Sequence, residues 1–273
     1  MLDVQRWPQL NDPVVVMSFS GWVDAGVAGA GAADYLATRV PGARVFGHVD
    51  LTELADLQRV RPIVKVEDGA FRSLTWPKID LVAGKAGRDF VVVHGPEPAR
   101  MWPSFAAELV GMAEHIGAQM AIGLGGMPAV TSHRRPVSVM ATASSASVAQ
   151  ELALIRPDYN GPTGVQTVVL MAMGRAGIPA VGLWAQVPHY VSATNSPAAI
   201  RALIERLRDV AGITVDLGPL DAQVDEYHAG IDRQLEDRPD IAEMVQSMED
   251  AQGSHIPTGD ELASEIERFL RDN

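Results

Sequence analysis

The sequence predicts an α/β fold of three layers, α/β/α, in which helices cover both faces of a mostly parallel or mixed β-sheet. Short apolar runs, rich in β-branched residues, recur along the chain and alternate with segments of helical periodicity. Within these runs the apolar residues are continuous rather than alternating, which indicates strands that are buried on both faces. With 47% hydrophobic and 21% charged residues, the composition is that of a chain that folds on its own.

The first predicted strand covers residues 13–18, where a proline precedes three consecutive valines. Runs of the same kind predict further strands at residues 43–49, 81–84, 90–94, 120–124, 137–141 and 180–187. Two more segments with strand character, residues 60–67 and 71–76, are separated by the turn residues Asp68 and Gly69. We expect these two segments to form a hairpin or an edge pair.

Helical patterns fill the intervals between the strands, at residues 25–40, 103–116, 145–155, 165–176 and 197–210. Asp24 fits the N-cap of the first helix, because its carboxylate could accept a hydrogen bond from a free backbone N–H. The last helix has Ser196 and Pro197 as start signals. Its apolar face consists of Ile200, Leu203, Ile204, Leu207 and Val210.

The β signal ends near Gly218, so we expect a core domain at residues 1–218 and an acidic helical appendage at residues 219–273. The appendage carries 15 Asp and Glu against 4 Lys and Arg, whereas the core carries 19 against 18. Three helical stretches are expected in it, and Thr258 with Glu261 forms a capping box before the third. The acidity would attract a basic partner surface, or it could serve solubility alone.

Composition excludes several classes of protein. The chain has no cysteine, which excludes disulfides, thiolate nucleophiles and cysteine-based metal centres. No apolar run is long enough to span a bilayer, and the first residues lack the features of a secretion signal, so we expect a cytoplasmic protein. The net charge of −12 makes a nucleic-acid partner unfavourable.

Irregular segments follow several of the predicted strands, and in open α/β sheets ligands bind outside the carboxyl ends of the strands. These segments are residues 20–24, 95–98, 125–136 and 188–190, and residues 160–164 precede a helix whose free N–H groups could receive an anion. The candidate cleft residues that they contain are Gly21, Trp22, Asp24, Gly95, Gly126, His133, Arg135, Thr163, His189 and Tyr190.

No signature of catalysis accompanies these segments. The sequence has no phosphate-binding loop, no complete dinucleotide fingerprint and no Gly-x-Ser-x-Gly elbow. The histidines His94, His133 and His189 are scattered singly, so we predict no catalytic residue, no metal site and no cofactor. His133, followed by Arg134 and Arg135, could hold a carboxylate or phosphate, or could form ion pairs with acidic residues of a neighbouring segment or subunit.

Taken in order, five motifs resemble the proteasome assembly chaperone 2 (PAC2) family, in particular its bacterial and archaeal members. The motifs are Gly21-Trp22-Val23-Asp24-Ala25-Gly26, Gly95-Pro96-Glu97-Pro98, Gly125-Gly126-Met127-Pro128, His133-Arg134-Arg135-Pro136 and Pro188-His189-Tyr190-Val191. The resemblance implies a fold similar to nucleoside phosphorylases and peptidyl hydrolases. It also implies a homo-oligomer, often a trimer, and a partner among proteasome subunits or other proteins.

Two kinds of function follow from these observations. The first is a non-enzymatic protein-binding or assembly-chaperone-like protein, favoured by the motifs and by the missing nucleophile. The second is a phosphorylase-like or hydrolase-like enzyme, or a ligand sensor, with an anion-binding cleft at the carboxyl ends of the strands. In the enzyme, His133 and Arg135 would hold the anion and Asp24 or His189 would act as acid or base.

Overall fold

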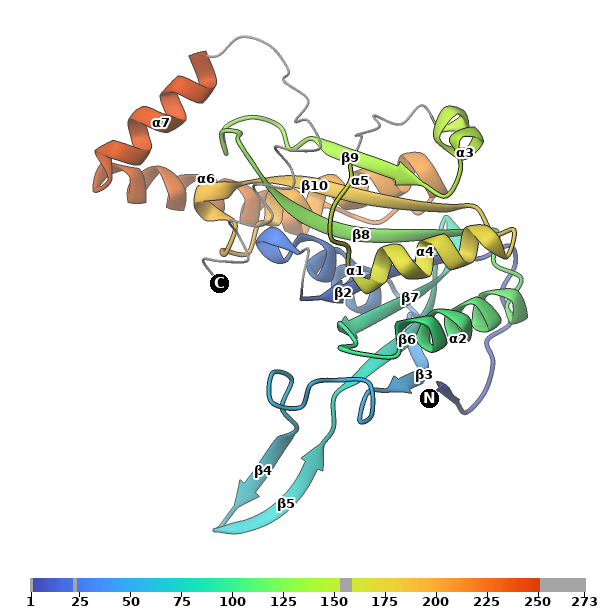
Figure 1. Ribbon diagram of the computed structural model, residues 1–273. Helices are drawn as coiled ribbons and strands as arrows, with labels where there is room; N and C mark the ends of the chain where they lie inside the picture. The colour runs from blue at the N-terminus through green and yellow to red at the C-terminus, as the bar shows by residue number, and fades with distance from the viewer. Residues whose placement is uncertain (1, 22–23, 153–158, 251–273) are drawn as a thin grey trace.

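The computed structural model describes residues 2–21, 24–152 and 159–250, and it confirms an α/β fold built on one large mixed sheet (Figure 1). In spatial order its eight described strands are β1 (Leu2–Val4), β3 (Arg44–Asp50), β6 (Lys78–Ala86), β7 (Arg88–Pro96), β2 (Val14–Ser20), β8 (Met120–Ala129), β10 (Ala180–Pro188) and β9 (Val139–Ala143). The four strands β7, β2, β8 and β10 run parallel, and the outer strands pair antiparallel. Of the described strands only β1 was not predicted, because its three residues contain Asp3 and form no apolar run.

Helices cover both faces of the sheet, as the continuous apolar runs predicted. The helices are α1 (Ala28–Arg39), α2 (Trp102–His115), α3 (Ala146–Glu151), α4 (Val165–Arg175) and α5 (Pro197–Ala211). The buried hydrophobic side chains form two large clusters, and alternate residues of β2 belong to different ones. Val16 packs in the cluster with α1 and α5, and Met17 packs in the cluster with α2 and α4. The chain therefore forms three layers, with β2 buried between the other two.

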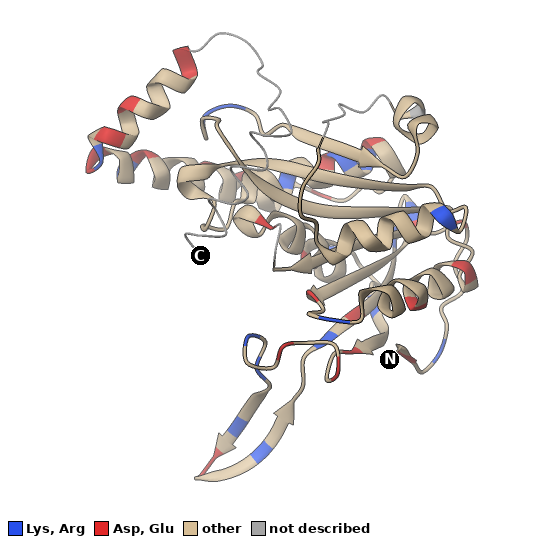
Figure 2. Cartoon of the chain, in the orientation of Figure 1, with Lys and Arg blue, Asp and Glu red and all other residues tan. Residues whose placement is uncertain are grey.

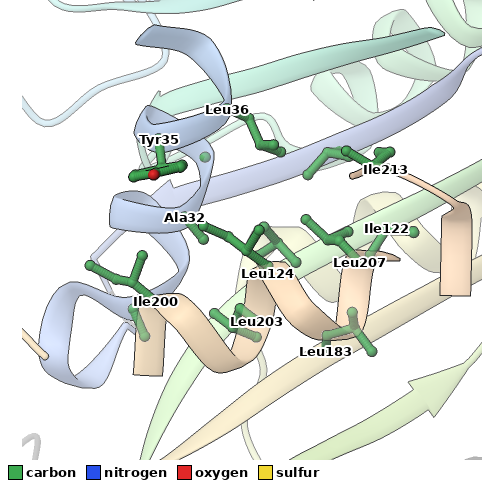
Figure 3. Packing of buried hydrophobic residues seen from close by; sticks show 14 of the residues in the cluster. Ala32, Tyr35, Leu36, Ile122, Leu124, Leu183, Ile200, Leu203, Leu207 and Ile213 are labelled. Carbon is green, nitrogen blue, oxygen red and sulfur yellow. The ribbon is translucent and has the colours of Figure 1, made fainter. Parts of the chain in front are cut away.

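The layer of α1 and α5 packs through fully buried aliphatic side chains (Figure 3). Leu36 of α1, Leu203 of α5 and Leu124 of β8 have at most 1% of their surface exposed. Burial of each such side chain contributes about 1.5–3 kcal/mol, so the apolar face predicted for α5 anchors this helix to the sheet.

Some predicted boundaries were wrong because pairing with neighbouring strands overrides the turn character of glycine and proline. Residues 125–128 were expected to be irregular, but they continue β8 and pair with residues 184–187 of β10. Gly95 and Pro96 likewise end β7, beside β2. The helix expected from residue 25 starts as a short 3-10 turn, η1 (Ala25–Val27), in which Gly26 and Val27 have left-handed backbone angles, and α1 follows it.

The strands β4 (Ile63–Glu67) and β5 (Ala70–Thr75) form a separate two-stranded hairpin, which confirms the hairpin prediction. Asp68 and Gly69 have positive φ angles of 52° and 73°, as a tight two-residue hairpin turn requires. We call residues 63–75 the hairpin arm, because they extend away from the body of the molecule (Figure 1). Every residue of the two strands is exposed.

Two helices of the acidic C-terminal part are described, α6 (Gly218–Glu236) and α7 (Pro239–Asp250). Ile231, Leu235 and Val245 form a small buried cluster with Tyr190 and Val191, which follow β10 in the short 3-10 turn η2 (His189–Val191). The third helix expected in this part, with Thr258 and Glu261, lies outside the described residues. None of the described helices is long and apolar enough to cross a bilayer.

Candidate functional site

Asp24 lies where the chain leaves β2, and its carboxylate caps α1. Oδ1 accepts a hydrogen bond from Gly29 N at 2.7 Å, and Oδ2 accepts one from Ala30 N at 3.2 Å. Burial raises the pKa of Asp24 to about 6, although the two backbone hydrogen bonds oppose the rise. Of the two roles weighed for Asp24, capping is the one that its hydrogen bonds serve.

Two glycines let the start of α1 approach the sheet closely. Asp24 forms an isolated parallel bridge with Gly126 of β8, and a Cβ on Gly126 would lie 2.1 Å from Ala25 O. A Cβ on Gly29 would lie 2.3 Å from Leu124 O. Below Gly29, the buried Oγ of Ser18 finds no hydrogen-bond partner among the described residues. The candidate residue Gly126 therefore has a structural reason to be glycine.

Glu97 makes a second intramolecular cap. Its Oε1 accepts a hydrogen bond at 2.9 Å from the backbone N–H of Val165, the first residue of α4. This N–H belongs to the helix start where the sequence predicted an anion, so a carboxylate of the chain itself occupies that place. Thr163 lies two residues before it and is exposed. A Cβ on Gly21 would lie 3.1 Å from Glu97 Oε2, so Gly21 makes room for this side chain.

His133 lies in a different environment, under the C-terminal helices. Its ring is buried, with Nδ1 at 2.7 Å from Tyr190 Oη and Nε2 at 3.2 Å from Asp232 Oδ1 of α6. The Tyr190 hydroxyl also accepts a hydrogen bond from His133 N at 2.9 Å. Burial lowers the pKa of His133, although the hydrogen bond with Asp232 opposes the fall.

The residues that flank His133 hold α6 and α7 against the core. Arg134 donates to Asp232 at 2.7 Å and to Glu249 at 3.4 Å, and Arg135 Nη2 donates to the backbone oxygen of Glu249 at 2.7 Å. Ser132 Oγ donates to Glu249 Oε1 at 2.8 Å. We call residues 132–135 the basic clamp. Of the two roles predicted for the His133-Arg134-Arg135 motif, the structure therefore supports ion pairs with acidic residues of a neighbouring segment.

His189 and Tyr190 follow β10 beside the clamp. His189 Nδ1 lies 3.4 Å from Ala129 O, and the His189 and Tyr190 rings are 5.6 Å apart at nearly a right angle. The crevice lined by His133 and Arg135 has a volume of only about 10 Å³. These candidate residues form a packed junction rather than an open cleft.

A larger groove, of about 520 Å³, lies along α1 at the carboxyl ends of β2 and β7. The helices that follow these two strands, α1 and α2, pack on opposite faces of the sheet, which makes this a topological switch point. Of the predicted site residues, Gly95 lines this groove. Asp24, His133, Arg135 and His189 do not line it, so the structure does not gather the proposed acid, base and anion-binding groups in this groove. Trp22 lies outside the described residues.

Sequence reasoning missed the partners that explain the site residues. It gave no structural partner to Glu97, Asp232 or Glu249. Each of these carboxylates contacts a residue 68 to 117 positions away in the chain. No local pattern signals such a contact, and only the acidity of residues 219–273 indicated that basic residues would find partners there.

Comparison with known proteins decides the family. The model of the PAC2 family matches residues 18–235, which include the groove, both caps and the basic clamp. The chain belongs to the PAC2 family. The resemblance predicted from the five motifs is therefore confirmed. Among functionally curated proteins, none matches the sequence.

Solved structures of PAC2 relatives share the fold. A PAC2 family protein from Streptomyces avermitilis is 38% identical, with a TM-score of 0.79 over 86% of this chain and 100% of the other. A proteasome-assembly chaperone homologue from Mycobacterium tuberculosis is 36% identical, with a TM-score of 0.78 over 85% and 99%. An archaeal proteasome activator from Pyrococcus furiosus, 17% identical with a TM-score of 0.70 over 86% and 98%, shares the fold alone.

Proposed function

We propose that this PAC2 family member is a non-enzymatic protein that binds proteasome subunits and assists their assembly. The observation that carries the proposal is the 36% identity, over nearly the whole of the other chain, with a proteasome-assembly chaperone homologue. A partner of this kind agrees with the protein-binding role that the sequence motifs favoured.

The state of the charged site residues supports a binding protein over an enzyme. Asp24 and Glu97 cap helices, and His133, Arg134 and Arg135 are engaged with Tyr190, Asp232 and Glu249. A general acid or base must reach the proton that it transfers, and a nucleophile needs a base within hydrogen-bond distance. These side chains instead serve the fold, which supports a binding protein.

The acidic surface of α6 and α7 supports contact with a basic partner. Residues 218–250 contain ten Asp and Glu against two Lys and Arg, and the acidic positions recur along both helices (Figure 2). Charge complementarity of this kind speeds encounter and favours particular partners more than it adds affinity. The association should therefore weaken as the salt concentration rises, because exposed charges are screened within about 8–10 Å.

Self-association is the second part of the proposal. We propose a homo-oligomer, a trimer as the family resemblance implies. The exposed apolar side chains of the hairpin arm support this part, because an isolated chain would leave them in water.

Co-purification from the native host tests the proposed function. A tagged copy of the chain is expressed at its natural level, and the bound proteins are identified by mass spectrometry at low and high salt. We expect proteasome α-subunits to be enriched at low salt, relative to a tagged acidic protein of similar size. Repeated recovery of the chain without proteasome subunits would contradict the proposal.

A further inference from the structure

The end of α6 and the helix α7 project from the three-layer core, and a small junction attaches them to it (Figure 1). The apolar part of this junction is the cluster of Val191, Ile231, Leu235 and Val245, which is far smaller than the two clusters that flank the sheet. Its polar part centres on His133, whose side chain is 0% exposed. A change in the charge of His133 therefore acts on an attachment that has few apolar contacts.

The hydrogen bonds around His133 fit a neutral imidazole. Nδ1 lies 2.7 Å from Tyr190 Oη, and Nε2 lies 3.2 Å from Asp232 Oδ1. Because an ionised carboxylate can only accept, Nε2 carries the proton, and Nδ1 accepts a hydrogen bond from the Tyr190 hydroxyl. The same hydroxyl oxygen accepts one from His133 N at 2.9 Å. In this arrangement both ring nitrogens, the hydroxyl group and the backbone N–H all have partners.

A second proton on the ring disrupts this arrangement. Protonation turns Nδ1 from an acceptor into a donor, so the Tyr190 hydroxyl loses the acceptor of its own hydrogen. A buried polar group that is left without a partner destabilises the folded state. The hydrogen bonds that join His133 to Tyr190 therefore favour the neutral ring.

The charges around His133 oppose a second proton as well. The titratable and charged groups that surround it are Tyr190 of η2, Tyr227, His228 and Asp232 of α6, Glu249 of α7, and Arg134 and Arg135 of its own loop. The His228 ring lies 6.0 Å from the His133 ring, and its buried Nε2 has no hydrogen-bond partner among the described residues. Arg134 already contacts Asp232 Oδ1 at 2.7 Å, so this carboxylate compensates an added positive charge only in part.

A protonated His133 ring also has no access to water while the junction is closed. Burial lowers the pKa of His133 below its usual value of 6.5, and the charges of Arg134 and His228 lower it further, although Asp232 opposes the fall. The crevice beside the ring, lined also by Tyr227 and His228, has a volume of about 10 Å³, which is room for about one water molecule. Full hydration of the charged ring therefore requires α6 to move away from the core.

We propose that His133 is a pH-sensitive latch, whose neutral ring holds the end of α6 and α7 against the core and whose protonation at mildly acidic pH releases them. The direction follows from the lowered pKa of His133 in the closed junction. The closed junction is most stable above pH 6.5 and loses stability as the pH falls below that value, because the released form binds the proton more readily. The latch goes beyond the proposed function, since it concerns the attachment of the two helices whatever partner they bind.

Amide hydrogen exchange at pH 7.5 and pH 5.5, with exposure times scaled to the intrinsic exchange rates, tests the latch. We expect the protection of residues 231–250 to fall by up to about tenfold at pH 5.5, because this pH lies one unit below 6.5, while β2 loses no protection. In His133→Gln the amide can still donate to Asp232 but does not titrate, so the protection should not depend on pH. The control His48→Gln, at a partly exposed position of β3, keeps the response of the wild type. Equal protection of the wild type at both pH values, or an equal fall in His133→Gln, overturns the inference.

An NMR titration of the His133 ring in the wild type is the second measurement, and it holds even where His133→Gln loosens the junction at every pH. We expect the ring to gain its proton below pH 6.5, over the same pH range in which α7 loses its protection. A ring that gains its proton while α7 stays protected overturns the inference. A loss of protection while the ring stays neutral overturns it too.

Discussion

Asp24 shows how a residue with an unusual pKa can serve structure. Its carboxylate occupies the start of α1, where the helix dipole and two backbone N–H groups favour a negative charge. Burial acts in the opposite direction and is the larger effect, so the pKa rises to about 6 instead of falling. A raised pKa at the end of a strand would suggest a general base, but both carboxylate oxygens of Asp24 accept hydrogen bonds from backbone N–H groups of α1.

The raised pKa of Asp24 predicts a pH dependence of stability. Between the unfolded pKa of 3.8 and the folded pKa of about 6, the folded state binds more protons, so stability falls as pH rises through this window and is constant above it. The loss amounts to at most about 3 kcal/mol, because one pKa unit corresponds to about 1.4 kcal/mol.

Urea unfolding of the wild type and Asp24→Asn from pH 4 to pH 8 measures this contribution. Asparagine keeps a capping oxygen but does not titrate, so we expect the variant to gain stability relative to the wild type as pH rises to 6. Asp24→Ala serves as the control that removes the cap, at a cost of about 0.5–2 kcal/mol. A difference between wild type and Asp24→Asn that is independent of pH would contradict the assignment.

Tyr190 and Tyr227 allow a matched comparison of two tyrosine hydroxyls at the junction under α6. The Tyr190 hydroxyl contacts both the backbone N–H and the ring of His133, whereas the buried Tyr227 hydroxyl has no hydrogen-bond partner among the described residues. Tyr190→Phe leaves the backbone N–H and the ring Nδ1 of His133 without their hydrogen-bond partner. We therefore expect a loss of about 1–3 kcal/mol in the free energy of unfolding. Tyr227→Phe should be neutral or stabilising. Equal losses in both variants would show that the hydrogen bonds of Tyr190 contribute nothing specific.

Among the elements, the strands and helices of the core were the part that the sequence predicted well. Continuous apolar runs such as residues 13–18 and 180–187 predicted strands correctly, because burial on both faces requires apolar residues at successive positions. The hairpin was predicted from its turn residues, Asp68 and Gly69. The continuation of β8 through residues 125–128 was missed, because the pairing that holds it there comes from β10, more than fifty residues away.

The candidate site was less predictable than the fold for the same reason. The motifs at residues 125–128 and 95–96 proved to lie in strands, and the roles of Asp24, Glu97 and His133 depend on partners that the fold brings together. The His-Arg-Arg segment was open to two interpretations in the sequence. The carboxylates of Asp232 and Glu249 decided between them.

The basic clamp should control how firmly α6 and α7 are attached. Arg134 and Arg135 are exposed, so each contributes modestly, but both reach the last turn of α7 through Glu249. In Arg134→Ala/Arg135→Ala we expect faster amide hydrogen exchange in α7 and unchanged protection in β2. Arg208→Ala, which loses a surface pair with its neighbour Asp209, is the matched control. Unchanged exchange in α7 of the double variant would show that the apolar cluster alone holds the helix.

The whole molecule combines a buried three-layer core with two surfaces of opposite character. One is the hairpin arm, which exposes apolar side chains and carries two basic and two acidic residues, and the other is the acidic pair α6 and α7 (Figure 2). A catalyst needs a gathered set of reactive groups, but a scaffold needs separate surfaces for its own copies and for its client. We propose the exposed hairpin arm for the first of these and the acidic faces of α6 and α7 for the second.

The most direct test of the proposed function is the rate at which proteasome α-subunits of the same organism assemble into rings when the chain is present. We expect faster ring formation on native gels, with the chain bound to the assembling subunits and the effect reduced at high salt. Asp225→Asn/Glu226→Gln, at exposed positions of α6, should weaken the effect more than Glu114→Gln on α2. Unchanged assembly with no bound chain, at low salt and with the wild-type protein, would contradict the account.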